Sequence, residues 1–198
     1  MLVYNSRLIN TPVLSVQAGG PIGYIASLII DPSGLKTIAF RLGGPLVDRT
    51  PAKYLDVSSV REYSDLGLII DDIEELVSPD DVVHLADTIQ LNFDLLTLKV
   101  ETKKKTKLGK IIDFTLNSDD FLVQQLVVKR PLVKSFVDSE LIIPRAEIIE
   151  VTDYKIVVKD EEKTIKEKSR TAEFVPNFVN PFRKTEPGFA PTDTKDND

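Results

Sequence analysis

The chain carries an internal repeat. Residues 23–31 and 109–117 both open with glycine, alternate apolar side chains, and close with a turn-forming Asp31 or Asn117. Three later pairs of segments also match, namely 38–40 with 126–128, 55–60 with 143–148 and 62–70 with 150–158. Because two copies of one sequence pattern form two copies of one structural unit, the repeat predicts two similar domains in tandem.

The spacing between matching segments changes once along the chain. It is 86 residues for the first pair and 88 residues for the three later pairs. Turns accept inserted residues more easily than strands do, so we place the change in the turn that follows residue 117. The sequence thus predicts that the first hairpin of the second copy is two residues longer than that of the first copy.

Both copies show the sequence signals of β-strands. Short runs of Val, Ile, Leu and Thr are bounded by Gly, Pro, Asp, Asn and Ser. Residues 31–34 read Asp-Pro-Ser-Gly, which suits a type I turn because proline favours the second position and glycine the fourth. Residues 117–120 take the same place in the second copy. Short strands with frequent turns are typical of a small barrel or sandwich, and we favour the barrel.

The segments outside the copies have a different character. Ser78, Pro79 and the acidic residues after them are typical of a helix start, which predicts a short helix or helical turn between the copies. Beyond residue 160 the chain is first highly charged and then rich in proline, so it cannot bury enough apolar surface to fold. The predicted all-β organisation is a first domain at 1–77, a linker helix at 78–89, a second domain at 90–160 and a disordered tail at 161–198.

Residue types exclude several kinds of active site. The chain has no cysteine and only one histidine, His84, which excludes disulfides, thiolate zinc sites and two-histidine metal sites within one chain. The acidic residues between 71 and 81 lack the spacing of a calcium loop. The Gly-Gly-Pro segments at 19–21 and 43–45 do not continue into the Gly-Lys-Ser/Thr of a phosphate loop, and we interpret them as turns. We therefore expect no catalytic residue, no cofactor and no metal; an enzyme that relies on carboxylates alone ranks last.

Charge and hydropathy bear on the surroundings of the protein. A formal net charge of −6 disfavours a protein whose whole surface tracks nucleic-acid phosphates. The first residues lack the features of a secretory signal, and no apolar run approaches the roughly 20 residues of a membrane-spanning helix. The sequence predicts a cytoplasmic protein without a transmembrane segment; it leaves the oligomeric state open.

Two segments are candidates for partner binding. A dense basic run is expected at the tip of an exposed hairpin, where it could contact an acidic protein, RNA or acidic lipid, or could simply keep the strand edge from pairing with other chains. It consists of Lys103, Lys104, Lys105 and Lys107, with Lys110 close behind. In the tail, Phe174, Phe178 and Phe182 recur at four-residue spacing. They either pack on the protein's own domains or form a short motif that docks on another protein.

The repeated unit resembles the PRC-barrel family. The resemblance rests on the glycine-led strands and turns at 23–31 and 109–117 and on the segments that follow, and it covers residues 4–74 and 90–159. It implies a small β-barrel that acts as a non-catalytic adaptor for a protein partner. Family members include the C-terminal domain of the ribosome maturation factor RimM, so the alternative is a factor associated with RNA or ribosome biogenesis. The chain lacks the membrane helix of the reaction-centre H chain and the N-terminal barrel of RimM, so neither specific role transfers.

Overall fold

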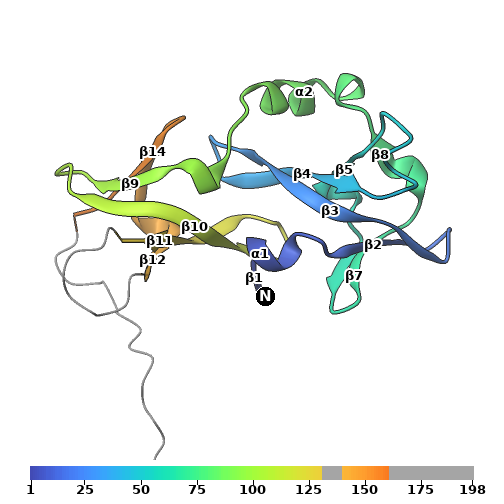
Figure 1. Ribbon diagram of the computed structural model, residues 1–198, viewed down its shortest axis with the longest axis horizontal. Helices are drawn as coiled ribbons and strands as arrows, with labels where there is room; N and C mark the ends of the chain where they lie inside the picture. The colour runs from blue at the N-terminus through green and yellow to red at the C-terminus, as the bar shows by residue number, and fades with distance from the viewer. Residues whose placement is uncertain (131–139, 161–198) are drawn as a thin grey trace, which may run out of the picture. The chain divides into compact units, whose positions relative to one another are not determined.

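A computed structural model describes residues 1–130 and 140–160 of the chain. β-Strands dominate these residues, together with two short α-helices and several 3-10 turns (Figure 1). The prediction of an all-β protein is confirmed. The predicted tail at 161–198, which includes Phe174, Phe178 and Phe182, lies outside the described residues.

The strands form two sheets. Within the described residues, the N-terminal sheet has the order β6 (Glu62–Ser64), β7 (Gly67–Ile70), β2 (Pro12–Ser15), β3 (Gly20–Asp31), β4 (Lys36–Gly43), β5 (Tyr54–Asp56) and β8 (Leu76–Val77). The C-terminal sheet has the order β12 (Glu140–Pro144), β11 (Val123–Lys129), β10 (Lys107–Asn117), β9 (Lys99–Thr102), β14 (Lys155–Val158) and β13 (Ile148–Val151). The N-terminal strand β1 (Leu2–Tyr4) also pairs with β10 (Figure 1).

Six strands of each sheet follow the same plan. The order β6-β7-β2-β3-β4-β5 in one sheet corresponds to β13-β14-β9-β10-β11-β12 in the other. The parallel pair occupies the same place in both, as β2 with β7 and as β9 with β14. We call two residues equivalent when they occupy the same place in this shared pattern. In neither sheet does the hydrogen-bonded order close on itself within the described residues, so closed barrels stay a prediction.

The two glycines that lead the repeated segments have similar surroundings. Gly23 pairs with Val13 of β2, and Gly109 pairs with Val100 of β9. A Cβ atom on Gly23 would lie 2.6 Å from the carbonyl oxygen of Gly43, and one on Gly109 would overlap the carbonyl oxygen of Lys129. Each glycine is therefore required by the close approach of the next strand's final carbonyl.

The predicted difference in hairpin length is wrong. Ser27 pairs with Arg41 and Asp113 pairs with Val127, so the spacing of 86 residues continues through both strands of the hairpin. The extra residues lie in the next connection: Arg41 pairs with Tyr54, thirteen residues on, whereas Val127 pairs with Ile142, fifteen residues on. Side chains alternate with a period of two, so a two-residue slip keeps the apolar face unchanged and the sequence pattern cannot reveal it.

Apolar side chains of both sheets form one buried cluster. Equivalent positions are buried alike: Ile25 and Ile111, and Leu68 and Ile156, are at most 1% exposed. Burial of a side chain of this size stabilises the fold by about 2 kcal/mol. A shared core means that the two sheets depend on each other for part of their stability.

The tips of the two first hairpins meet and exchange hydrogen bonds. The backbone N–H of Val123 donates to the carbonyl of Leu35 at 3.0 Å, and that of Thr37 donates to the carbonyl of Phe121 at 3.1 Å. Leu35 and Phe121 are equivalent residues; both have positive φ, 46° and 52°, and both are 3% exposed. The Phe121 ring also packs edge to face on Phe40, with ring centroids 5.0 Å apart. The contact is thus reciprocal, as in a two-fold symmetric interface.

A short helical segment joins the sheets. Ser78 precedes the 3-10 turn η3 (Pro79–Asp81), and its backbone N–H donates to the Asp81 carboxylate at 3.2 Å. The α-helix α2 (Val83–Gln90) begins only after an extended Val82, later than the sequence signal suggested. Its Leu85 packs against the N-terminal sheet. Across residues 1–130 and 140–160, every helix is too short to cross a lipid bilayer.

Candidate functional site

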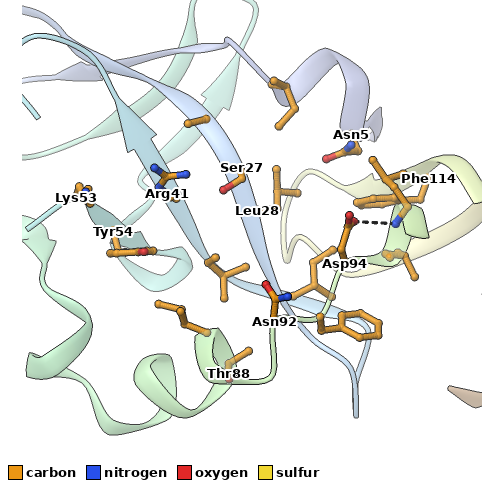
Figure 2. A pocket seen from close by; sticks show the side chains of 18 residues that line it. Asn5, Ser27, Leu28, Arg41, Lys53, Tyr54, Thr88, Asn92, Asp94 and Phe114 are labelled. Atoms are coloured by element: carbon orange, nitrogen blue, oxygen red, sulfur yellow. Dashed lines mark hydrogen bonds between the residues drawn. The ribbon is translucent and has the colours of Figure 1, made fainter. Parts of the chain in front are cut away.

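A pocket of about 620 Å³ lies on the N-terminal sheet (Figure 2). Its walls come from β3, β4, the start of β5, the helix α1 (Asn5–Leu8), the end of α2, the segment that follows α2, and Phe114 of β10. Segments far apart in the sequence therefore build it together. Much of the lining is apolar, supplied by Leu28, Ile29, Ile89, Phe93, Leu96 and Phe114.

One wall of the pocket is polar and positively charged. Ser27, Arg41 and Tyr54 are paired across β3, β4 and β5, which places their side chains on one face of the sheet. Lys53 comes just before β5 and also lines the pocket. In the view of Figure 2, Arg41 lies between Ser27 and Lys53. This wall therefore contributes two cationic residues to the lining of the pocket.

Among the described residues, the two cations have no counterion. Arg41 is exposed and Lys53 is half-buried. Within the part of the chain that the structure describes, neither side chain makes a hydrogen bond or an ion pair. Two cationic residues in the lining of one pocket raise its positive potential, which favours the binding of an anion.

The opposite wall follows α2. Asn92 has a φ of 48°, and its backbone N–H donates to the carbonyl of Ile89 at 3.0 Å, which ends the helix. Asp94 then accepts a hydrogen bond from the backbone N–H of Leu96 at 3.0 Å and so begins the 3-10 turn η4 (Leu95–Thr97). Asp94, the one carboxylate among the described residues that line the pocket, is thereby engaged by backbone, on the wall away from Arg41 (Figure 2).

The basic run lies on the turn between β9 and β10. Lys103, Lys104, Lys105 and Lys107 are all exposed. The turn is held by backbone hydrogen bonds, because Lys105 N–H donates to the Thr102 carbonyl at 2.8 Å and Lys103 N–H donates to the Val158 carbonyl at 3.0 Å. This segment, residues 103–107, is the basic hairpin. Its lysines form a fixed, solvent-facing group of positive charges.

Two titrating groups flank the basic hairpin. The pKa of Asp160 is lowered, first by a hydrogen bond from the Thr102 hydroxyl and then by the backbone N–H of Lys104 and the charges of nearby lysines. The pKa of Lys155 is raised, chiefly by its hydrogen bond to Glu101, whose carboxylate oxygen lies 2.6 Å from Nζ. Both shifts favour the charged forms, so these groups tie β14 and the chain after it to the hairpin.

Other residues considered in the sequence have local roles. His84 is exposed on α2, and its carbonyl accepts a hydrogen bond from the Thr88 hydroxyl at 2.8 Å. Asp71 pairs with Arg61 at 2.6 Å, and Asp72 accepts from the Glu74 N–H at 3.2 Å. No group of His, Asp and Glu side chains in residues 1–130 and 140–160 is arranged to hold a metal ion.

The sequence indicated the lysines but missed the pocket. Phe174, Phe178 and Phe182 lie outside the described residues, so their role stays a prediction. Arg41 and Lys53 gave no signal, because single polar residues in and beside a strand are what an ordinary solvent-facing position shows. Arg41 and Lys53 both line the pocket because β4 pairs with β5. This arrangement could be found only by pairing the two strands in the correct register.

Comparison with protein-family models finds no match to this chain, and comparison with curated proteins finds no relative.

Proposed function

We propose that the protein is a non-catalytic binding or assembly module, built from tandem PRC-type units, that contacts an acidic protein partner through the basic hairpin. The observation that carries this proposal is the exposure of Lys103, Lys104, Lys105 and Lys107 on one turn held by backbone hydrogen bonds. The shared strand order of the two sheets supports the tandem arrangement.

The hydrogen-bonded backbone of the hairpin favours a role in binding over a role that only keeps the strand edge from pairing with other chains. A turn whose backbone is held by hydrogen bonds loses little backbone entropy when it binds, so the lysine side chains project from a backbone that is arranged in advance. The chain as a whole has a net charge of −6, so an acidic partner is repelled by most of the surface and attracted at the hairpin. Charge therefore directs an acidic partner toward the hairpin.

RNA is the second candidate partner, and the same four lysines favour it. Lysines can neutralise phosphates, and a ribosomal role would match the resemblance to RimM. No aromatic side chain stands among residues 103–107 to stack on a base. The acidic protein is therefore the preferred partner.

The test is affinity purification with the full chain and two variants of equal charge. One variant carries Lys→Gln at 103, 104, 105 and 107; the control carries Lys→Gln at the exposed Lys36, Lys99, Lys129 and Lys159. A partner retained by the wild type and the control but lost by the hairpin variant supports the proposal, and resistance of that complex to ribonuclease assigns it to protein. Equal retention by all three chains would contradict the proposal. Deletion of 171–198 tests the phenylalanine segment separately.

A further inference from the structure

The pocket on the N-terminal sheet has the composition of a small-molecule site. Its volume of about 620 Å³ falls within the range of roughly 300–1,000 Å³ that such sites occupy. It is neither wholly apolar nor wholly polar, because Leu28, Phe93 and Phe114 line part of it while Arg41 and Lys53 line another part. A ligand that fits must therefore combine an apolar body with a charged end.

The sign of that charged end follows from the two cations. Arg41 and Lys53 have no partner in the part of the chain that the structure describes, and Asp94 on the far wall already accepts from the Leu96 N–H. An arginine offers two parallel donors to a carboxylate or phosphate, and a neighbouring lysine adds a third. Ser27, paired directly with Arg41, places one more hydroxyl beside them.

The equivalent places of the C-terminal sheet show that these charges do not follow from the fold. Val127 is equivalent to Arg41 and Leu141 is equivalent to Lys53. Asp113 stands where Ser27 does, and it accepts hydrogen bonds from the hydroxyl and backbone N–H of Ser6 at 2.6 and 3.2 Å. At these places the C-terminal sheet has two buried apolar side chains and a hydrogen-bonded carboxylate, whereas the N-terminal sheet has a pocket lined by two cations.

We propose that this pocket binds a small amphiphilic anion. The carboxylate, phosphate or sulfonate of the ligand lies against Arg41 and Lys53, and its aliphatic or aromatic body lies on the apolar wall formed by Leu28, Phe93 and Phe114. This site is separate from the basic hairpin and does not depend on it.

The test uses a fluorescent probe with both features, 8-anilinonaphthalene-1-sulfonate, and its uncharged analogue N-phenyl-1-naphthylamine. The full chain is compared with the Arg41→Gln/Lys53→Gln variant and with a control of equal charge, Arg49→Gln/Lys36→Gln, at exposed residues outside the pocket. We expect the pocket variant to bind the sulfonate at least about tenfold more weakly, since the charged donors of both Arg41 and Lys53 are lost. The control should bind it as the wild type does, and all three chains should bind the uncharged probe alike.

Two further measurements keep the outcome decisive. Equal sulfonate binding by the pocket variant and the wild type would overturn the proposal, and so would equal weakening of both probes. Octyl phosphate should displace the sulfonate at a concentration at which inorganic phosphate does not; equal displacement by both would overturn the amphiphilic part of the proposal. Unchanged circular dichroism and melting temperature of the variant establish that lost binding is not lost folding.

Discussion

The N-terminal and C-terminal sheets share a pairing pattern but differ in the side chains at some equivalent positions. Strand order, the single parallel pair and the glycine under the next strand's carbonyl are the same in both. At equivalent positions, however, Arg41 is exposed and Lys53 is half-buried, whereas Val127 and Leu141 of the other sheet are buried. The comparison teaches that the same strand pairing is compatible with a charged, accessible place in one sheet and a buried, apolar one in the other.

The largest expected effect tests whether the two sheets are one cooperative unit. Phe121→Ala and Leu35→Ala each remove a buried side chain from the contact between hairpin tips. We expect losses in the free energy of unfolding of about 4 and about 3 kcal/mol, the size typical of large-to-small core substitutions. Urea unfolding followed by circular dichroism should show a single transition in each case. Two separated transitions would mean that the sheets unfold independently and that the tips do not couple them.

The equivalent glycines Gly23 and Gly109 should differ in how much their substitution by alanine lowers the free energy of unfolding. Gly109→Ala puts a Cβ into the Lys129 carbonyl at a φ of 149°, so we expect a loss of about 3 kcal/mol in the free energy of unfolding. Gly23 has the close contact without that positive φ, and Gly23→Ala should cost less, about 1–2 kcal/mol. Gly20→Ala is the control, because nothing lies within 4 Å of its Cβ position. A loss for Gly109→Ala no greater than that of the control would contradict the close approach of the Lys129 carbonyl to Gly109.

Removal of one buried hydroxyl in each sheet should raise the free energy of unfolding. The side-chain oxygens of Thr37 and Thr115 are buried and have no hydrogen-bond partner among the described residues. Valine has nearly the same shape and no polar group to desolvate, so Thr37→Val and Thr115→Val should each raise the free energy of unfolding by about 1 kcal/mol. Thermal denaturation measures the change. A destabilised variant would indicate that the hydroxyl is satisfied in solution.

The smallest expected effect concerns the stability of the protein at acidic pH and involves the C-terminal sheet alone. The pKa of Asp160 is lower in the folded protein than its usual 3.8, so its stabilising contribution is present above that value and is lost as pH falls through the folded pKa. Asp160→Asn should therefore flatten the decline in stability below pH 3.8. Urea unfolding at a series of acidic pH values tests this, and an unchanged slope would show that the carboxylate is not held by Thr102 and Lys104.

The strands could be predicted from the sequence more readily than their register. An all-β chain with a repeated unit was predicted from the alternating apolar residues, from Gly23 and Gly109, and from the turn at Asp31. Burial and turn formation each require a recognisable local sequence pattern. The position of the two extra residues was missed, since a shift by a full side-chain period leaves that pattern unchanged. The pocket was missed for a related reason: Arg41, Lys53 and Phe93 come together through long-range pairing and not through any short motif.

The reciprocal contact of the hairpin tips has a consequence for how this sequence can change over time. Leu35 and Phe121 are held in the same unusual backbone conformation, and each tip's carbonyl accepts the other tip's N–H. A substitution that alters the size or conformation of one tip therefore creates pressure for a compensating change 86 residues away. The two halves of the chain are expected to co-vary at these positions, while the residues at their other equivalent positions diverge in sequence.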